Sequence, residues 1–140
     1  MLVQVAVENY KSIESEIVFK MMASGLKGHP SHKVKTKFSK LNDLLRLGAV
    51  YGANASGKTN LIEAIHFGQQ LIVEGTQSGE RIRAKPFKLS SEFTSEPTTI
   101  EFVIYLDDQL YTYGFSVTDK EVVEEWLFAQ RPGAKERKLF

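Results

Sequence analysis

Cysteine is absent from the 140 residues, which excludes disulfide bonds, thiolate metal sites and cysteine nucleophiles. This absence is typical of a reducing compartment, and we expect a cytoplasmic protein. An excess of one charge is also absent, since 18 basic side chains stand against 17 acidic ones, so the overall charge predicts neither a nucleic acid nor a membrane as partner. No run approaches the roughly 20 apolar residues of a membrane span. The first residues lack the layout of a secretory signal, and we expect Met1 to begin the folded protein.

The sequence does contain enough apolar material for one ordinary domain, because 42% of its residues are hydrophobic. Residues 2–8 alternate short aliphatic and polar side chains, which predicts a strand starting almost at the terminus. Residues 16–21 predict a second strand. The polar turn at residues 9–13 lies between the two, so a hairpin is the simplest geometry for this part of the chain.

The second half of the chain has the composition of β-structure. A polar connection at residues 76–97 precedes β-branched and aromatic runs at 99–106 and 110–117. Asp107-Asp108-Gln109 joins these two runs and supplies residues typical of a turn, which predicts another hairpin. Residues 121–130 predict a further strand.

Residues 23–40 lack periodicity and are rich in lysine, which predicts a flexible basic loop. Its cations are Lys27, Lys33, Lys35, Lys37 and Lys40. Such a run can contact nucleic-acid phosphates, but a solvated loop is favoured because Phe38 is its one interleaved aromatic residue and the whole chain is near neutral. His29 and His32 have no third ligand nearby in the sequence, so they do not predict a metal site.

The most legible unit is a strand, a glycine-rich turn and a helix. The short apolar run at residues 48–51 predicts a strand covered on both faces. From Lys58 to about Val73 apolar residues recur at helical spacing, and Gly75 is placed to end the helix. The turn between them has the P-loop pattern, in which Gly, four further residues and Gly precede Lys and Ser or Thr.

Each fixed position of this P-loop has a chemical reason. Gly52 and Gly57 permit backbone angles and close approach that side chains forbid, so that successive N–H groups can surround phosphate oxygens. The helix N-terminus adds partial positive charge at the same place. Lys58 is expected to reach the β- and γ-phosphates, and the Thr59 hydroxyl to ligate Mg²⁺. The sequence therefore predicts ATP with Mg²⁺ as its ligand.

The residues around the P-loop resemble a particular branch of these proteins. Residues 51–64, which read YGANASGKTNLIEA, are similar to the Walker A segment of ABC-type ATPases related to SMC, RecF and the OLD family. Residues 7–13, VENYKSI, resemble their opening strand and Asn-Phe-(Arg/Lys)-Ser turn, with Tyr10 in place of Phe. Residues 110–115 and 125–127 look like the antiparallel lobe of an OLD-like subgroup of AAA-type ATP-binding proteins, many of which serve abortive infection and phage defence.

This resemblance implies an α/β P-loop lobe with a large antiparallel β portion, spanning residues 1–140, with the rest of the ATPase core downstream. It implies phosphate or Mg²⁺ contacts from Gly52, Ala53, Asn54, Ala55, Ser56, Gly57, Lys58, Thr59 and Asn60, and secondary nucleotide contacts from Asn9, Lys11 and Ser12. Lys58 would stabilise transition-state charge on the phosphate. The heads would form a homodimer or higher oligomer around ATP, acting on DNA or on an effector protein, with no membrane partner.

The acidic residue that ATP hydrolysis requires is missing from the recognisable motifs. Residues 103–108 end in Asp107-Asp108 after an apolar run, but the alternation on both sides favours a hairpin turn over a catalytic strand. Residues 131–138 form a charged stretch with no closing element. We therefore expect an ATPase when the protein is complete, and an isolated chain that lacks the catalytic carboxylate and is inactive.

Two other classes of function remain open. A small-molecule or nucleoside kinase also uses a P-loop, but its lid needs several arginines, and only Arg81 and Arg83 stand in a suitable loop. A nucleotide-binding scaffold without turnover would explain the missing acid. A guanine-nucleotide switch is disfavoured because no Asn-Lys-x-Asp segment is present.

Overall fold

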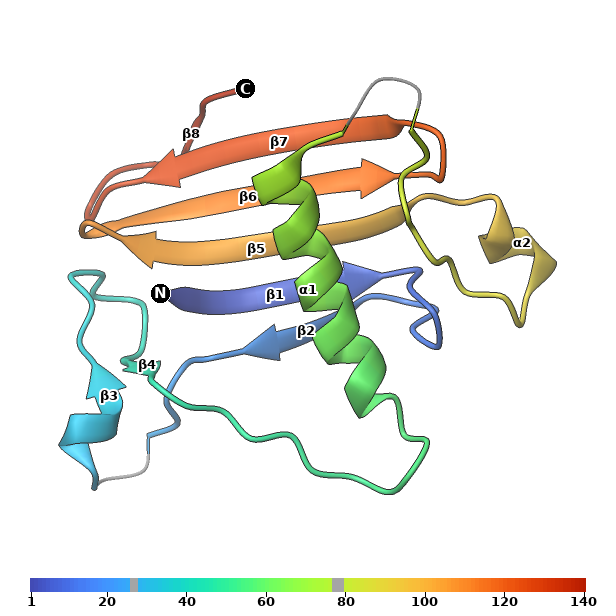
Figure 1. The fold of residues 1–140 in the computed structure, drawn as a ribbon. Coiled ribbons are helices and arrows are strands. Elements are labelled where there is room, and N and C mark those ends of the chain that lie inside the picture. The colour runs from blue at the N-terminus through green and yellow to red at the C-terminus, as the bar shows by residue number, and fades with distance from the viewer. Residues whose placement is uncertain (26–27, 77–79) are drawn as a thin grey trace.

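The structure is a computed structural model that describes residues 1–25, 28–76 and 80–140. Its main element is a six-stranded antiparallel sheet with strand order β2-β1-β5-β6-β7-β8 (Figure 1). The strands are β1 (Leu2–Glu8), β2 (Ile17–Lys20), β5 (Thr98–Leu106), β6 (Gln109–Val117), β7 (Val122–Gln130) and β8 (Arg137–Lys138). A separate two-stranded sheet pairs β3 (Lys33–Val34) with β4 (Leu44–Leu45). The predicted large antiparallel portion is confirmed.

Strand β1 lies inside the sheet, between β2 and β5. Its alternating valines face the core, and Val5 and Val7 are completely buried. Val5 pairs with Phe19 of β2 on one side and with Phe102 of β5 on the other. The predicted hairpin of β1 and β2 is therefore confirmed, and β5 adds a neighbour that lies about a hundred residues away in the sequence.

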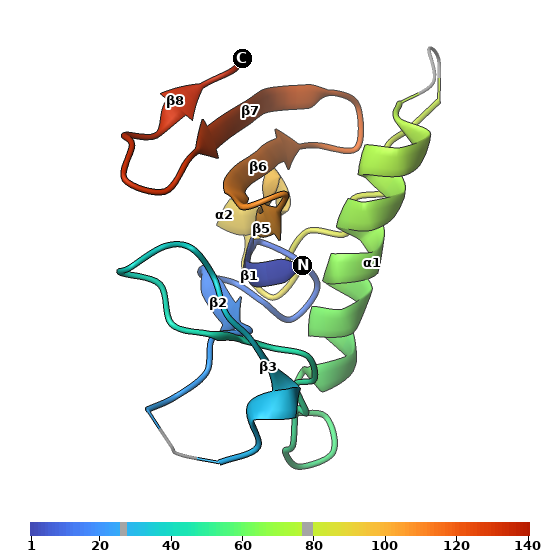
Figure 2. The same cartoon turned by 90° about the vertical axis from the view of Figure 1, so that its left-hand side faces the viewer.

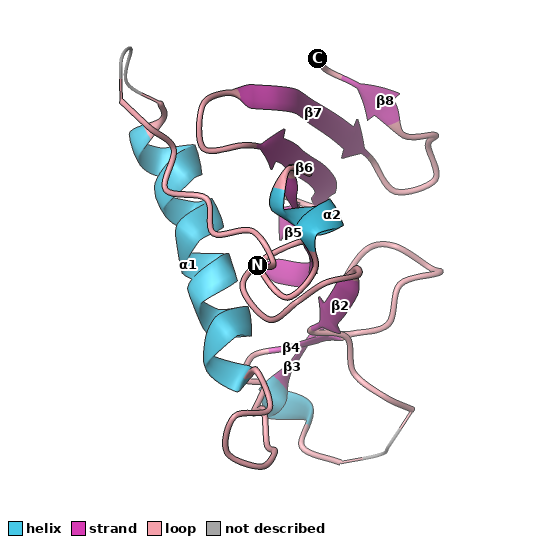
Figure 3. Ribbon diagram, turned by 90° about the vertical axis from the view of Figure 1, so that its right-hand side faces the viewer, coloured by secondary structure: helices cyan, strands magenta, loops and turns pink. Residues whose placement is uncertain are grey.

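One long helix, α1 (Lys58–Glu74), covers one face of this sheet (Figures 2 and 3). It ends at Gly75, whose φ of 70° and N–H bond to the carbonyl of Leu71 are typical of a helix stop, as the sequence predicts. Gly68 lets the helix approach the sheet, because a Cβ there would lie 2.8 Å from the ring of Phe102. Leu61 and Ala64 join the same buried core, so they mark the face of the helix that packs on the sheet.

The strands from β5 to β7 pair as the sequence predicts, and β8 adds a pairing that was not predicted. Asp107 and Asp108 have φ values of 49° and 61°, which form the tight two-residue turn that suits a twisted hairpin of β5 and β6. β7 pairs with β6 as expected. The expectation that residues 131–138 contain no closing element is wrong, because β8 turns back and pairs Arg137 with Ala129 of β7.

Two further segments differ from the sequence interpretation. Residues 80–97 are not a merely polar connection, because Ile82 and Phe87 are buried and a short helix, α2 (Ser91–Thr94), follows them. Residues 28–46, which we call the basic flap, hold a 3₁₀ turn, η1 (Pro30–His32), and both strands of the small sheet. The described part of residues 23–40 is thus largely exposed and irregular, with one 3₁₀ turn and one short strand. Its flexibility stays a prediction, and Lys27 lies outside the described residues.

The buried strand predicted at residues 48–51 is not formed. These residues are irregular and exposed, with Val50 at 40% and Tyr51 at 90% exposure. A lone extended segment cannot satisfy its backbone groups through a ladder, and no strand of the described chain runs parallel beside this one. The P-loop thus has its helix but lacks the preceding strand.

In the described chain, no helix is long and apolar enough to cross a membrane.

Candidate functional site

The P-loop lies at the beginning of α1. Gly57 precedes the helix with a φ of 89°, and Ala55 also has a left-handed φ of 63°. Because a helix cannot supply partners for the first N–H groups of its own backbone, these donors need another acceptor. No side chain caps them at Gly57. The loop therefore offers backbone donors and the positive end of a 17-residue helix at one place.

Lys58 folds back over the loop. Its Nζ donates to the carbonyl oxygens of Gly52 at 2.8 Å and Ala53 at 2.5 Å, and lies 3.3 Å from Ser56 Oγ. A Cβ at Gly52 would lie 2.8 Å from Ser56 Oγ, so a larger residue there would make the Ser56 hydroxyl move. The ammonium group thus lies across the loop, where it can exchange carbonyl oxygens for phosphate oxygens.

The turn between β1 and β2 packs against the start of α1. Asn60 Nδ2 donates to Ser12 Oγ at 2.6 Å, and Ser12 Oγ would lie 3.3 Å from a Cβ at Gly57. Lys11 forms an ion pair with Glu63, one helical turn further on. Of the turn residues predicted to contact nucleotide, Lys11 and Ser12 are therefore brought beside the P-loop.

Tyr10 anchors the same turn through its ring. It is 3% exposed and stacks on Phe67 of α1, with ring centroids 5.8 Å apart. Its hydroxyl reaches the carbonyl oxygen of Glu63 at 3.5 Å. Burial raises the pKa of the Tyr10 phenol, so the hydroxyl stays protonated and remains a donor at neutral pH. The ring of Tyr10 thus stacks on the helix, and its hydroxyl adds a polar contact.

Asn9 lies in the same turn but faces away from the P-loop. It is 1% exposed, and its Nδ2 donates to the carbonyl oxygens of Phe93 and Glu96, each at 2.8 Å, with a longer contact of 3.3 Å to Pro97. Its Oδ1 accepts the N–H of Phe87 at 2.8 Å. The predicted nucleotide contact therefore has no free donor, and Asn9 holds the turn to the segment around α2.

The remaining loop residues are accessible. Residues 50–56 are exposed, and so is Thr59 on the first turn of α1. Backbone N–H donors, a lysine and a hydroxyl at a helix N-terminus are the groups that bind a Mg²⁺-bound triphosphate. The residues present fit Mg-ATP.

The two aspartates that follow the apolar run at residues 103–106 lie away from the P-loop. Asp107 and Asp108 form the β5–β6 turn at the end of the sheet next to the flap, so the structure agrees with the hairpin interpretation of this segment. Asp108 accepts a hydrogen bond from Tyr105 at 2.7 Å and pairs with Lys37, and these contacts lower its pKa. Among the described residues, no group of three His, Asp or Glu side chains is arranged to hold a metal ion. Within that part of the chain, Thr59 is thus the one candidate Mg²⁺ ligand from the P-loop motif.

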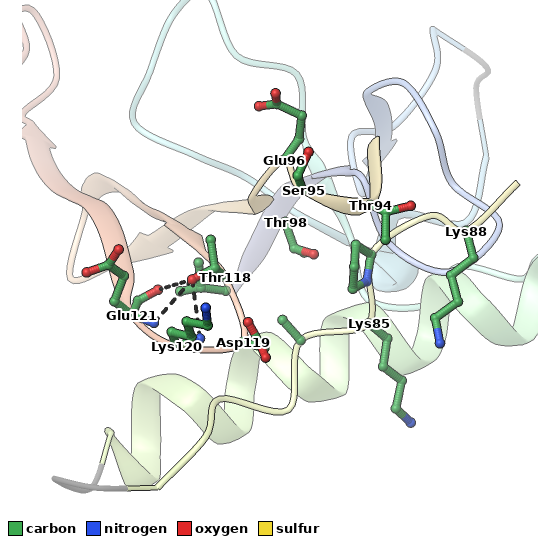
Figure 4. Close-up of a pocket in the computed structure, with 13 residues that line it drawn as sticks. Lys85, Lys88, Thr94, Ser95, Glu96, Thr98, Thr118, Asp119, Lys120 and Glu121 are labelled. Atoms are coloured by element: carbon green, nitrogen blue, oxygen red, sulfur yellow. Dashed lines mark hydrogen bonds between the residues drawn. The ribbon is translucent and has the colours of Figure 1, made fainter. Parts of the chain in front are cut away.

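A further cleft is separate from the P-loop. It encloses about 580 Å³ between residues 84–98 and the β6–β7 turn, and no P-loop residue lines it. Figure 4 shows that its lysines and carboxylates point in different directions; Glu96, for example, points away from Lys85 and Lys88. Thr118 uses its hydroxyl within its own turn. The groups around this cleft do not converge on one ligand.

Comparison with known proteins adds a family. No curated protein matches the chain. A family model described as "AAA domain, putative AbiEii toxin, Type IV TA system" matches residues 48–139, which include the P-loop, α1 and strands β5 to β8 but neither β1 nor the basic flap. Because this match spans more than half of the chain and contains its nucleotide-binding P-loop, the chain belongs to that AAA domain family.

Proposed function

We propose that this chain is the Mg-ATP-binding P-loop part of an SMC/RecF/OLD-like ABC-type ATPase. The observation that carries the proposal is the closed loop at the start of α1, where Lys58 lies across the carbonyls of Gly52 and Ala53 beside helix N–H groups that no side chain caps. A second support is the turn of Lys11 and Ser12, which the resemblance to these ATPases places next to nucleotide and which contacts α1 here.

The roles of the residues follow from their positions. The backbone of residues 52–60 would surround the phosphates, Lys58 would neutralise them, and Thr59 would ligate Mg²⁺, whose chemistry is to screen phosphate charge. Ser12 would hold Asn60, and Lys11 would add a cation at the edge of the site. Asn9 would act through the fold, by fixing the turn.

The wider function is ATP-driven association of two heads, which controls DNA processing or a defence effector. The family description, a putative AbiEii toxin of a type IV toxin–antitoxin system, agrees with a defence role. Hydrolysis would need a carboxylate supplied from outside these residues, by a further segment or by a partner. The free energy of nucleotide binding would then drive closure of the heads.

The test is titration calorimetry with Mg-ATP on the full chain and on Lys58→Ala, with light scattering on the same samples. Loss of a charged phosphate contact is expected to weaken binding by about ten- to a hundredfold. Lys88→Ala is the matched control, because Lys88 is exposed and lines the cleft away from the P-loop. Equal affinities of the two variants would refute the site. ATP binding without any increase in scattering would refute head association for this chain.

A further inference from the structure

The basic flap concentrates positive charge. Residues 28–46 hold five basic side chains and one acidic side chain, a net charge of +4. Because the whole chain carries +1, the other residues together carry −3. The near-neutral total therefore hides a separation of charge, and a segment of this sign attracts polyanions. The flap lies outside the residues that the family model matches.

The flap has a defined backbone. β3 pairs with β4, the N–H of Arg46 donates to the carbonyl of His32 at 3.0 Å, and Leu44 is completely buried. The N–H of Ala23 donates to the carbonyl of Asp43 at 2.7 Å, which ties the flap to the chain that follows β2. Cations on a fixed backbone lose less conformational entropy when they bind than cations on a mobile loop.

A second set of contacts docks the flap on the large sheet. The N–H of Lys37 donates to the Tyr105 hydroxyl at 3.2 Å, and Lys37 Nζ lies 2.6 Å from Asp108 Oδ2. The ring of Phe38 meets the Tyr105 ring edge-on, with centroids 6.3 Å apart. Figures 1 and 2 show the flap beside this end of the sheet, with α1 on another side.

Three cations of the flap remain available to a partner. Lys35, Lys40 and Arg46 are exposed, and none of them forms an ion pair with the part of the chain that the structure describes. Lys37 is different, because Asp108 already balances its charge. The available cations are thus separate from the one that docks the flap.

We propose that the basic flap binds the phosphate backbone of duplex nucleic acid. Single-strand binding uses exposed aromatic platforms, and the one Phe, Tyr or Trp residue of the flap, Phe38, is packed on Tyr105, while the rings of His29 and His32 lie against each other with centroids 5.4 Å apart. Binding to an anionic membrane surface uses exposed apolar side chains, and the flap, all of which is described, exposes no large one. Backbone contact through lysine and arginine is independent of sequence and sensitive to salt.

The proposed contact between the flap and the duplex does not require nucleotide in the P-loop. The duplex-binding experiment can therefore refute the flap without refuting the ATP site, and the ATP titration can refute the ATP site without refuting the flap. The experiment is fluorescence anisotropy of a labelled duplex of about 24 base pairs with the full chain, between about 50 and 200 mM NaCl. The test variant is Lys35→Gln/Lys40→Gln/Arg46→Gln. The control is Lys88→Gln/Lys120→Gln/Lys135→Gln, which removes the same charge from exposed positions outside the flap.

The test variant is expected to bind at least about tenfold more weakly at low salt, and its slope of log affinity against log salt is expected to fall by about 2 to 3, since each phosphate contact contributes about 0.9. The control is expected to change by less than about threefold. The fluorescence emission of Trp126 checks that each variant is folded. If the triple variant unfolds, the three single Gln substitutions are measured instead, and each is expected to weaken duplex binding by a correspondingly smaller factor. No binding by the wild-type chain, equal loss in both variants, tighter binding of a single strand, or flap-dependent binding to anionic vesicles instead of the duplex would each overturn the proposal.

Discussion

Replacement of Asn9 by alanine separates a structural role from a ligand contact. Asn9 is buried, and it bonds Phe93 and Glu96 through its amide nitrogen and Phe87 through its amide oxygen. Asn9→Ala removes these bonds and leaves the buried N–H of Phe87 and two partly buried carbonyls without their partner. The residue also has a φ of 50°, which asparagine tolerates better than alanine.

The magnitude follows from these contacts. Three hydrogen bonds at about 1 kcal/mol each and a further cost of about 1 to 2 kcal/mol for unsatisfied groups and backbone strain give about 4 to 5 kcal/mol. That is a large share of the 5 to 15 kcal/mol by which domains are typically stable. For a domain of this size it corresponds to a fall in the unfolding midpoint of about 15 °C.

The assay is thermal unfolding by circular dichroism, followed by ATP calorimetry well below the midpoint. We expect a large loss of stability and an ATP affinity close to that of the wild type once the chain is folded. A midpoint within about 3 °C of the wild type, together with a loss of ATP affinity, would refute the reasoning and make Asn9 a direct nucleotide contact.

Asn9→Asp is the matched control for shape. It keeps an acceptor for the Phe87 N–H but points a second oxygen at carbonyl oxygens, so burial and repulsion raise the pKa of the introduced carboxyl above about 4 in the folded state. A raised pKa means that stability is greatest below the unfolded value and is lost as the pH rises through the folded one. Asn9→Asp is therefore expected to be more stable at pH 4, relative to wild type, than at pH 7.

Two further outcomes test the sheet. Gly114→Ala is expected to lower the free energy of unfolding by about 1 to 3 kcal/mol and to shift the emission of Trp126, because a Cβ at this position would lie 2.3 Å from the indole ring. The Nε1 of that indole donates to Glu101 at 2.8 Å. Unchanged emission together with an unchanged urea midpoint would contradict the close packing. Burial and a short hydrogen bond to Glu125 raise the pKa of Tyr113 to about 12. The contribution of Tyr113 to stability is therefore complete below about pH 10 and is lost as the pH rises toward 12. The absorbance titration of Tyr113→Phe should lack one ionisation step at high pH, and a titration curve identical to that of the wild type would contradict the raised pKa.

The features predicted from sequence are those that depend on near neighbours. Gly75 ends α1, and Asp107-Asp108 forms a tight turn, because each needs only a few adjacent residues to decide its conformation. The residues of the P-loop motif were identified in the same way. An apolar run such as residues 48–51 shows that a segment is suited to burial, but it does not show whether a neighbouring strand is there to pair with it. The prediction of a buried strand at residues 48–51 was wrong for this reason.

The features that were missed depend on distant partners. Asn9 has the sequence context of a surface turn, but the groups it bonds lie 78 to 88 residues further along the chain. The position of the basic flap has the same origin, since Lys37 and Phe38 contact Tyr105 and Asp108. No local pattern contains these pairings.

The contacts that join the β1–β2 turn to the P-loop helix are of two kinds, and they differ in strength. Lys11 and Glu63 are 25% and 42% exposed, so water screens their ion pair and it contributes on the order of 0 to 1 kcal/mol. Tyr10 is buried against Phe67, and burial of a side chain of that size contributes on the order of 2 kcal/mol. The apolar contact therefore fixes the helix beside the turn, while Lys11 can exchange its carboxylate for another anion at small cost. A phosphate-binding site needs both properties, because its frame must stay in place while its cations change partners.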